Sequence, residues 1–174
     1  MYNPIKAIYA GSFDPFTTGH LDIIKRSLCI CTHLIIAIGV NPAKKTLFSA
    51  EERIDMIQGV LIDELSVVET NKVSVFMPVA FDGLLVDFAK KQNANILIRG
   101  IRSVTDFEYE TNLAHINKLL APNIDTVFLP ATPELSVVSS SMVKEIARYG
   151  GDIKRFVPAQ IADAVYAKLN NIAK

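Results

Sequence analysis

Short apolar runs alternate with amphipathic segments along the chain, and this alternation limits the fold more than any other feature. The apolar runs have the length of β-strands, and the segments between them carry apolar residues at helical spacing. Alternating strands and helices favour parallel strands that are joined by crossover helices. We therefore expect an α/β fold built on an open, parallel, five-stranded sheet. The strands are predicted at about 4–10, 33–39, 72–77, 95–99 and 125–129.

The helices between these strands are expected on both faces of the sheet, which is the Rossmann-like arrangement. The first helix is predicted at about 18–31 and a later one near 104–120. Around residues 62–72 the apolar period weakens, and charged and polar residues accumulate. We expect an exposed connection there.

Start and stop signals mark the other helices. Ser49 begins a capping box that opens the second helix, and Asp82 is expected to cap the third. Gly150 and Gly151 should end a fifth helix, and Pro158 opens a terminal one.

Size and charge exclude several classes of partner. The 174 residues fit one domain spanning 1–174. No stretch approaches the ~20 apolar residues of a membrane helix and no charged-then-apolar leader is visible, so we expect a cytoplasmic protein without a membrane partner. The 18 basic and 18 acidic residues cancel, so polymeric nucleic acid is not an expected partner. Cys29 and Cys31 are expected to be reduced thiols.

Residues 11–20 join the first strand to the first helix and combine glycines, hydroxyl groups and a histidine. A helix N-terminus offers unpaired N–H groups and the positive end of the helix dipole, which together favour a phosphate. Gly11 and Gly19 allow the backbone to approach a ligand closely. Ser12 and two threonines add hydroxyl donors, and His20 adds an imidazole N–H. We therefore predict a phosphate site in this turn.

Further donors follow neighbouring strands, whose carboxyl ends meet at one edge of a parallel sheet. Lys44 follows the second strand. Arg99 and Arg102 follow the fourth and flank Gly100, and guanidinium groups match phosphate oxygens in paired hydrogen bonds. Residues 139–141 are three serines at a helix start, more than one cap requires. All of these groups are expected to reach the same phosphates.

Other ligand classes fit the sequence less well. An oxidoreductase that binds a dinucleotide would carry Gly-x-Gly-x-x-Gly after the first strand, where only Gly11 stands, and the P-loop motif is missing. Cys29, Cys31 and His33 resemble part of a zinc site, but no fourth ligand stands nearby, so no metal-binding side chains are predicted. A non-catalytic nucleotide-binding regulator remains an alternative.

Thr17, Gly19 and His20 are similar to the T/HxGH signature of the nucleotidylyltransferase superfamily. Further stretches follow in the order found in one family of this superfamily. They are residues 41–45, 98–102, 106–110 and 139–141. With them, the chain closely resembles the bacterial phosphopantetheine adenylyltransferase family over almost its whole length. The Ile-Arg-Gly-Ile-Arg and Asp-Phe-Glu-Tyr-Glu stretches are the most specific part of this resemblance.

The resemblance implies transfer of the adenylyl group of ATP to 4′-phosphopantetheine, giving dephospho-coenzyme A and pyrophosphate, with Mg²⁺ as cofactor. This is the penultimate step of coenzyme A synthesis. The phosphate of the acceptor would attack the α-phosphorus directly, without a covalent enzyme intermediate. The resemblance also implies a homohexamer. The nearest competing activity is adenylyl transfer to nicotinate mononucleotide, because enzymes with that acceptor share the first motif.

Site residues are implied by the same motif positions. His20, Lys44 and Ser12 would be catalytic, because they would neutralise charge that develops on the phosphates. The residues that would bind phosphopantetheine are Ser12, Lys44, Leu85 and Arg99. The residues that would bind ATP are Ser12, Phe13, His20, Gly100, Ile101, Arg102, Glu110, Leu135, Ser136, Val137, Val138, Ser139, Ser140 and Ser141.

Overall fold

The computed structural model describes residues 4–65 and 74–172, and strands and helices alternate through both ranges. The strands are β1 (Lys6–Gly11), β2 (His33–Gly39), β3 (Ser74–Phe81), β4 (Ile96–Ile101) and β5 (Asp125–Pro130). The α-helices are α1 (Thr18–Ser27), α2 (Ala50–Leu65), α3 (Leu85–Lys91), α4 (Val104–Leu120), α5 (Ser140–Arg148) and α6 (Ala159–Ile172). A short 3-10 helix, η1 (Pro133–Leu135), precedes α5.

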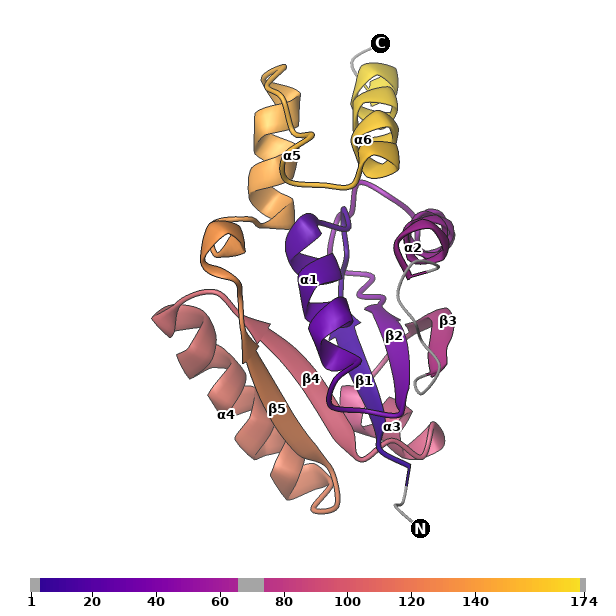
Figure 1. Cartoon of the computed structure of the whole chain (residues 1–174), viewed down its shortest axis with the longest axis vertical. Coiled ribbons are helices and arrows are strands. Elements are labelled where there is room, and N and C mark those ends of the chain that lie inside the picture. Colours follow the sequence, from indigo (N-terminus) through magenta and orange to yellow (C-terminus); the bar gives the residue numbers. More distant parts are fainter. Residues whose placement is uncertain (1–3, 66–73, 173–174) are drawn as a thin grey trace.

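The strands form one open parallel sheet in the order β3-β2-β1-β4-β5. The central strand is β1, in which Ala7 pairs with Leu34 of β2 on one side and with Ile96 of β4 on the other. The strand order therefore changes direction next to β1. In open sheets of this kind, ligands bind outside the carboxyl ends of the strands at such a point. Figure 1 shows β1 and β2 pointing toward α5 and α6, which lie beyond this edge.

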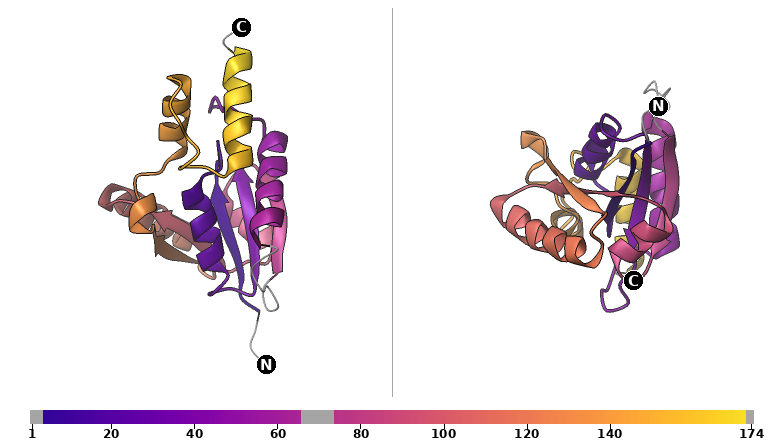
Figure 2. Two further views of the ribbon diagram at one scale, coloured as in Figure 1. Left: turned by 45° about the horizontal axis from the view of Figure 1, so that its top comes forward. Right: turned by 90° about the horizontal axis from the view of Figure 1, so that it is seen from below.

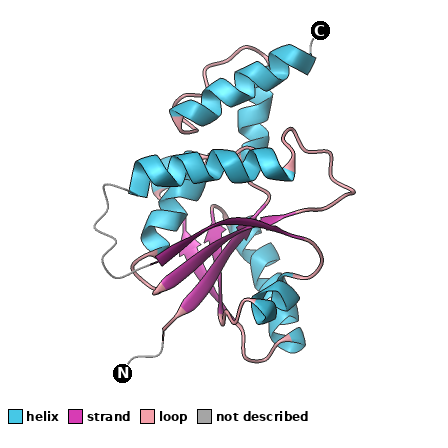
Figure 3. Cartoon of the chain, turned by 90° about the vertical axis from the view of Figure 1, so that its right-hand side faces the viewer, coloured by secondary structure: helices cyan, strands magenta, loops and turns pink. Residues whose placement is uncertain are grey.

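Alternate side chains of the central strands enter two separate cores, because successive residues of a strand face opposite sides of the sheet. Tyr9 of β1 and Ile36 of β2 belong to the larger core, which α1, α2, α5 and α6 complete. Ile8 and Ala37 belong to the smaller core, together with Val86 of α3. Helices therefore cover both faces of the sheet, as Figures 2 and 3 show, which confirms the predicted fold class.

The third strand differs from its prediction. It continues to Phe81, although Pro78 stands within it and the expected end was near 77. The pairing with β2 shifts register between Ile35 and Ala37, so that Phe76 and Val79 of β3 face residues two apart in β2. A β-bulge at the edge of the sheet accommodates a proline, because the missing N–H is not needed there. The predicted start at 72–73 lies outside the described residues.

Three helix boundaries also differ. The first helix ends at Ser27 rather than near 31, and the chain continues in turns closed by bonds such as Cys29 N–H to the Arg26 carbonyl. Asp82 does not cap α3, whose first residue is Leu85. The second helix continues to Leu65, so the expected connection is helical at 62–65, and its residues 66–72 lie outside the described ranges.

Several local signals are confirmed. Glu52 donates its backbone N–H to the Ser49 hydroxyl, and its carboxylate accepts the Ser49 N–H, which completes the capping box. Gly150 adopts a left-handed φ of 75° directly after Tyr149, the C-cap of α5, and glycine tolerates this conformation without strain. Within residues 4–65 and 74–172, every helix is too short or too polar to span a membrane.

Candidate active site

A cleft of about 420 Å³ opens at the carboxyl edge of the sheet, where the chain leaves β1 and β4. Its walls come from the turn after β1, the start of α1, the end of β4, the first turns of α4 and the segment that leads into α5. The lining residues are Tyr9, Ala10, Gly11, Ser12, Thr17, Gly19, His20, Ile23, Arg99, Gly100, Arg102, Asp106, Glu110, Ala131, Leu135, Val138, Ser139, Ser140 and Ser141.

The turn after β1 is fixed by Asp14, a carboxylate that is almost completely buried. Its oxygens accept the backbone N–H groups of Leu47 and Phe48 at 2.9–3.1 Å. The Lys144 ammonium of α5 donates to the same carboxylate at 2.8 Å. Because charge-assisted bonds of this kind are strong when buried, Asp14 joins three segments that are distant in sequence.

His20 lies in the first turn of α1, where its hydrogen bonds define the tautomer of the imidazole ring. Its Nδ1 accepts the backbone N–H of Thr17 at 3.0 Å, and the Thr17 hydroxyl lies 3.0 Å from the same nitrogen. A nitrogen that accepts a backbone N–H carries no proton, so in the neutral ring the proton lies on Nε2. His20 lines the cleft, and we infer that this Nε2–H is its donor toward a ligand.

The surroundings of His20 keep its ring neutral. Phe13 meets it edge-on with ring centroids 5.0 Å apart, and Phe16 lies at 5.5 Å. Burial among these rings, with a further effect of the Arg102 charge, lowers the pKa of His20 to about 3. The imidazole is therefore a neutral hydrogen-bond donor at physiological pH rather than a cation.

Phe13 positions the ring from an unusual backbone conformation. Its φ of 49° lies in the left-handed region, which bulky residues rarely adopt. The side chain is buried and turns back under Gly11, where an added Cβ would lie only 3.0 Å from the Phe13 ring. Glycine at position 11 therefore makes room for the ring that supports His20.

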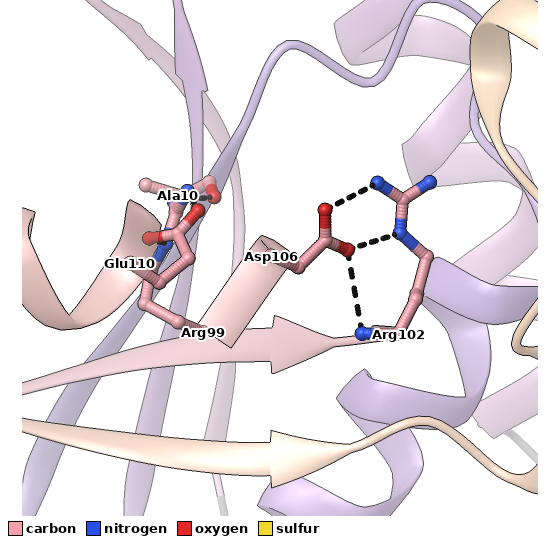
Figure 4. A network of polar contacts seen from close by, with 5 residues as sticks. All are labelled: Ala10, Arg99, Arg102, Asp106 and Glu110. Carbon is pink, nitrogen blue, oxygen red and sulfur yellow. Dashed lines mark hydrogen bonds and ion pairs between the residues drawn. The ribbon is translucent and has the colours of Figure 1, made fainter. Parts of the chain in front are cut away.

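The opposite wall carries two arginine–carboxylate pairs, which Figure 4 shows. Arg99 donates through Nε and Nη2 to the Glu110 carboxylate and through Nη1 to the Ala10 carbonyl at 2.7 Å. Arg102 donates through Nε to Asp106 at 2.8 Å. Both carboxylates belong to α4, so this helix holds the two guanidinium groups at the rim of the cleft.

Burial and charge shape the titration of this wall. Burial lowers the pKa of Arg99, but the hydrogen bonds and the negative charge of Glu110 outweigh this effect and raise it. Burial also raises the pKa of the Tyr9 phenol, which Arg99 and Arg102 only partly oppose. The cleft thus presents guanidinium groups, each paired with a carboxylate, next to neutral donors, and guanidinium groups of this kind can bind phosphate oxygens.

The three serines at 139–141 make different contacts. Ser139 caps α5 by accepting the Met142 N–H at 3.1 Å. Ser140 donates to the carbonyl of Pro15 at 2.8 Å and so joins this helix to the turn after β1. Ser141 is exposed at the cleft. All three serines therefore line the cleft, and one of them also serves as the cap of α5.

The structure brings most of the predicted site residues together. Of the residues implied by the family resemblance, those that line the cleft are Ser12, His20, Arg99, Gly100, Arg102, Glu110, Leu135, Val138, Ser139, Ser140 and Ser141. Those outside its lining are Phe13, Lys44, Leu85, Ile101, Ser136 and Val137. Lys44 is exposed in the loop after β2, and Leu85 packs partly buried against the smaller core.

Sequence reasoning assigned no role to Tyr9 or Asp14. Tyr9 reads as an ordinary strand residue, and nothing local distinguishes it from core. Asp14 had a possible signal, because a carboxylate stood inside a turn predicted to bind phosphate, where it must have a cationic or N–H partner. That partner is 130 positions away at Lys144, which no local pattern reveals.

Comparison with known proteins agrees with the class of fold. Residues 8–146 match the family model described as cytidylyltransferase-like. The nicotinic acid mononucleotide adenylyltransferase of Plasmodium falciparum superposes with a TM-score of 0.68 at 17% identity and covers 97% of each chain. A bifunctional NMN adenylyltransferase/ADP ribose pyrophosphatase from Francisella tularensis gives 0.65 at 16% identity, over 98% of this chain and 55% of that one. At such low identity these structures show the fold alone.

Two curated relatives define the family more narrowly. The phosphopantetheine adenylyltransferase of Mesorhizobium japonicum is 48% identical over 162 residues, which cover 93% of this chain and 95% of that protein. The one of Lachnoclostridium phytofermentans is 52% identical over 163 residues, with 94% of each covered. The chain belongs to the phosphopantetheine adenylyltransferase family.

Proposed function

We propose that the chain transfers the adenylyl group of ATP to 4′-phosphopantetheine, producing dephospho-coenzyme A and pyrophosphate. The observation that carries this proposal is the neutral His20, held by Thr17 so that its Nε2–H faces a cleft at the N-terminus of α1. The names of the two curated relatives supply the acceptor.

The chemistry needs no nucleophile from the protein. An oxygen of the acceptor's phosphate attacks the α-phosphorus of ATP, a new P–O bond forms, and the bond to the β-phosphate breaks as pyrophosphate leaves. Negative charge grows on the oxygens of the α-phosphate and of the leaving group. Donors that are already oriented stabilise that charge without reorganisation, and the phosphate turn supplies them.

Residue roles follow from position in the cleft. We assign the α- and leaving-group phosphates to Ser12, His20 and the serine segment at 139–141, and the acceptor's phosphate to Arg99. Arg99 keeps two N–H groups that have no partner among the described residues, so it can bind phosphate without releasing Glu110.

The residues outside the cleft lining need different explanations. We propose that Lys44 reaches the phosphates from its exposed loop only when substrate is bound, because its long side chain can span the rim. Leu85 would contact the acceptor's pantetheine arm. For Phe13, we propose that the backbone rather than the buried ring contacts ATP.

The donor set fits a magnesium ion that is bound largely by the phosphates of ATP. The two carboxylates of the cleft, Asp106 and Glu110, are bonded to arginines, and the described residues contain no cluster of three potential metal-binding acids, histidines or cysteines. Mg²⁺ commonly keeps several waters and binds substrate phosphates with few protein ligands. When bound, the ion would neutralise phosphate charge.

We further propose self-association, with a homohexamer as the expected state, through what we call the α4 face. This face consists of the exposed apolar residues Val104, Phe107, Tyr109, Ile116, Leu119 and Leu120. No residue of α4 is buried, although the helix is 17 residues long. So many exposed apolar side chains on one helix indicate an interface. We also propose a cytoplasmic location, in keeping with the two free cysteines.

The test of self-association is Leu119→Glu, because the Leu119 side chain is 83% exposed and a charge would have to be buried in any contact. We expect a smaller mass by light scattering than for the unchanged chain. Lys91→Ala, an exposed change on α3, is the control. An unchanged mass for Leu119→Glu would contradict the α4 face as the interface.

The test of function is pyrophosphate release from ATP and magnesium with 4′-phosphopantetheine or nicotinate mononucleotide as acceptor. We expect release only with the first. His20→Ala should lower kcat by about 10²–10³-fold, because one charge-stabilising donor is lost. His115→Ala, an exposed change on α4, should leave kcat unaltered. Release only with nicotinate mononucleotide would overturn the acceptor, and near-normal turnover of His20→Ala would overturn the role of His20.

A further inference from the structure

Arg53 is a buried arginine of α2 that is bonded to backbone rather than to a carboxylate. Only 3% of its surface is exposed. Its Nη1 donates to the Ser12 carbonyl at 2.7 Å, and its Nε donates to the Ser49 carbonyl at 3.1 Å. None of the ion pairs found within the described ranges includes it. Burying a guanidinium in this way costs desolvation that a surface arginine avoids. A function of Arg53 in shaping the phosphate-binding turn after β1 would explain why this cost is tolerated.

The bond to Ser12 fixes the orientation of one peptide unit. Within the described chain, the one cis bond is Asp14–Pro15, so the Ser12–Phe13 peptide is trans. In a trans peptide the C=O and the following N–H point in opposite directions. Because Arg53 holds the Ser12 carbonyl, the Phe13 N–H must point away from α2.

That N–H is an unused donor, and it belongs to the residue that follows Ser12 of the cleft lining. Neither the backbone bonds nor the side-chain bonds of the described residues give the Phe13 amide an acceptor. Buried amides without a partner are rare in folded proteins. Ser12, on the other side of the same peptide, lines the cleft. Successive N–H groups in such a turn form an anion-binding concavity.

We propose that Arg53 is a positioning residue that aims the Phe13 N–H at a phosphate group of bound ATP. This rests on the proposed function, which brings ATP into the cleft. Arg53 touches neither substrate nor reacting atoms and acts through the Ser12 carbonyl. The left-handed φ of Phe13 is part of the same device, because it places the buried ring under His20 while the amide stays available.

The hydrogen bond from Arg53 Nε to the Ser49 carbonyl also connects Arg53 to the loop after β2. Ser49 directly follows Leu47 and Phe48, whose N–H groups are held by Asp14. Arg53 and Asp14 therefore join the turn after β1 to the loop after β2 from two sides. Loss of Arg53 frees the Ser12 carbonyl to rotate, while the contacts of Asp14 keep both loops in place. Substitution of Arg53 should therefore weaken phosphate binding more than it destabilises the fold.

The test follows the Phe13 amide directly by NMR in protein labelled with ¹⁵N-phenylalanine, with Phe13→Leu to assign the signal. In the unchanged chain, the Phe13 amide proton should move downfield when ATP is added. In Arg53→Met that movement should be lost, and calorimetry should show ATP affinity lower by about tenfold or more, since a hydrogen bond to a charged group is lost. Arg53→Lys should recover part of the affinity, because an ammonium reaches one carbonyl.

Ile57→Val is the matched control, because Ile57 is fully buried one turn along the same helix and its apolar side chain cannot bond to either carbonyl. A retained Phe13 shift in Arg53→Met, or an ATP affinity equal to that of Ile57→Val, would overturn the proposal. If Arg53→Met does not fold, Arg53→Lys is used instead, and a Phe13 shift and an ATP affinity both equal to those of Ile57→Val would overturn the proposal. Binding of ATP requires no acceptor. The proposal for Arg53 is therefore tested by ATP binding, whereas the proposed function is tested separately by pyrophosphate release with phosphopantetheine.

Discussion

The two walls of the cleft are held in different ways. We call residues 11–20 the phosphate wall and residues 99–110 the arginine wall. The phosphate wall is held by buried contacts from distant segments, such as Asp14 with Lys144, whose side chains are 4% and 20% exposed. The arginine wall is held mainly by carboxylates of α4, and its outer pair, Arg102 with Asp106, is four positions apart with side chains 41% and 28% exposed.

This difference indicates different tasks. A wall fixed by buried, long-range bonds keeps its donors oriented before a ligand arrives, which is what stabilisation of developing charge requires. A partly exposed ion pair such as Arg102 with Asp106 can change partners at little cost, because such pairs contribute little net stability in water. The phosphate wall therefore suits stabilisation of the reacting phosphates. The arginine wall suits reversible binding of the substrates.

The largest expected effect compares one carboxylate from each wall. Asp14→Asn should lower the free energy of unfolding by about 3 kcal/mol, because the partly buried Lys144 ammonium loses its counter-charge. Asp106→Asn should cost less than about 1 kcal/mol, since its pair is partly exposed. Urea denaturation of the two variants measures both. Equal losses would show that the walls do not differ in rigidity.

A smaller effect concerns pH. His20 has a pKa of about 3 in the folded chain, against an ordinary value of 6.5. The unfolded chain therefore binds more protons between these values, so stability should be complete above pH 6.5 and fall as the pH is lowered toward 3. Because the ring edge meets the cleft, we expect about 2–3 kcal/mol rather than the full shift.

Unfolding midpoints measured across this pH range for the unchanged chain and for His20→Gln provide the test. Glutamine cannot titrate, so the variant should lose this part of the pH dependence. Identical slopes would mean that His20 is not protected from protonation by the phosphate wall.

The smallest effect belongs to the arginine wall. Glu110→Gln should lower stability by about 1–2 kcal/mol, because Arg99 keeps its bond to Ala10 but loses a charged partner. The KM for ATP should rise at the same time. Glu108→Gln, an exposed change on the same helix, serves as the control in denaturation and kinetics. A loss as large as that of Asp14→Asn would place Arg99 among the rigid parts of the cleft.

Local patterns determined much of the fold and part of the site. The periodicity of apolar residues distinguishes strands, which repeat every two residues, from helices, which repeat every 3.6 residues, and it can be seen within a single segment. The alternation of the two kinds of segment was therefore sufficient to predict the parallel sheet. Caps are equally local, which is why Ser49 and Gly150 mark helix ends as predicted. The turn at 11–20 was found for the same reason, since glycines, hydroxyls and His20 are neighbours in sequence.

Only the tertiary structure decided which groups share an environment. The bulge that carries β3 past Pro78 depends on pairing with β2 at the edge of the sheet. The partners of Asp14 and Arg53 come from α5 and from both loops, and they are brought together by the strand order. Lys44, predicted beside the phosphates, is exposed outside the cleft lining. Sequence fixes the period and ends of each element, whereas contacts between distant segments depend on how all elements pack at once.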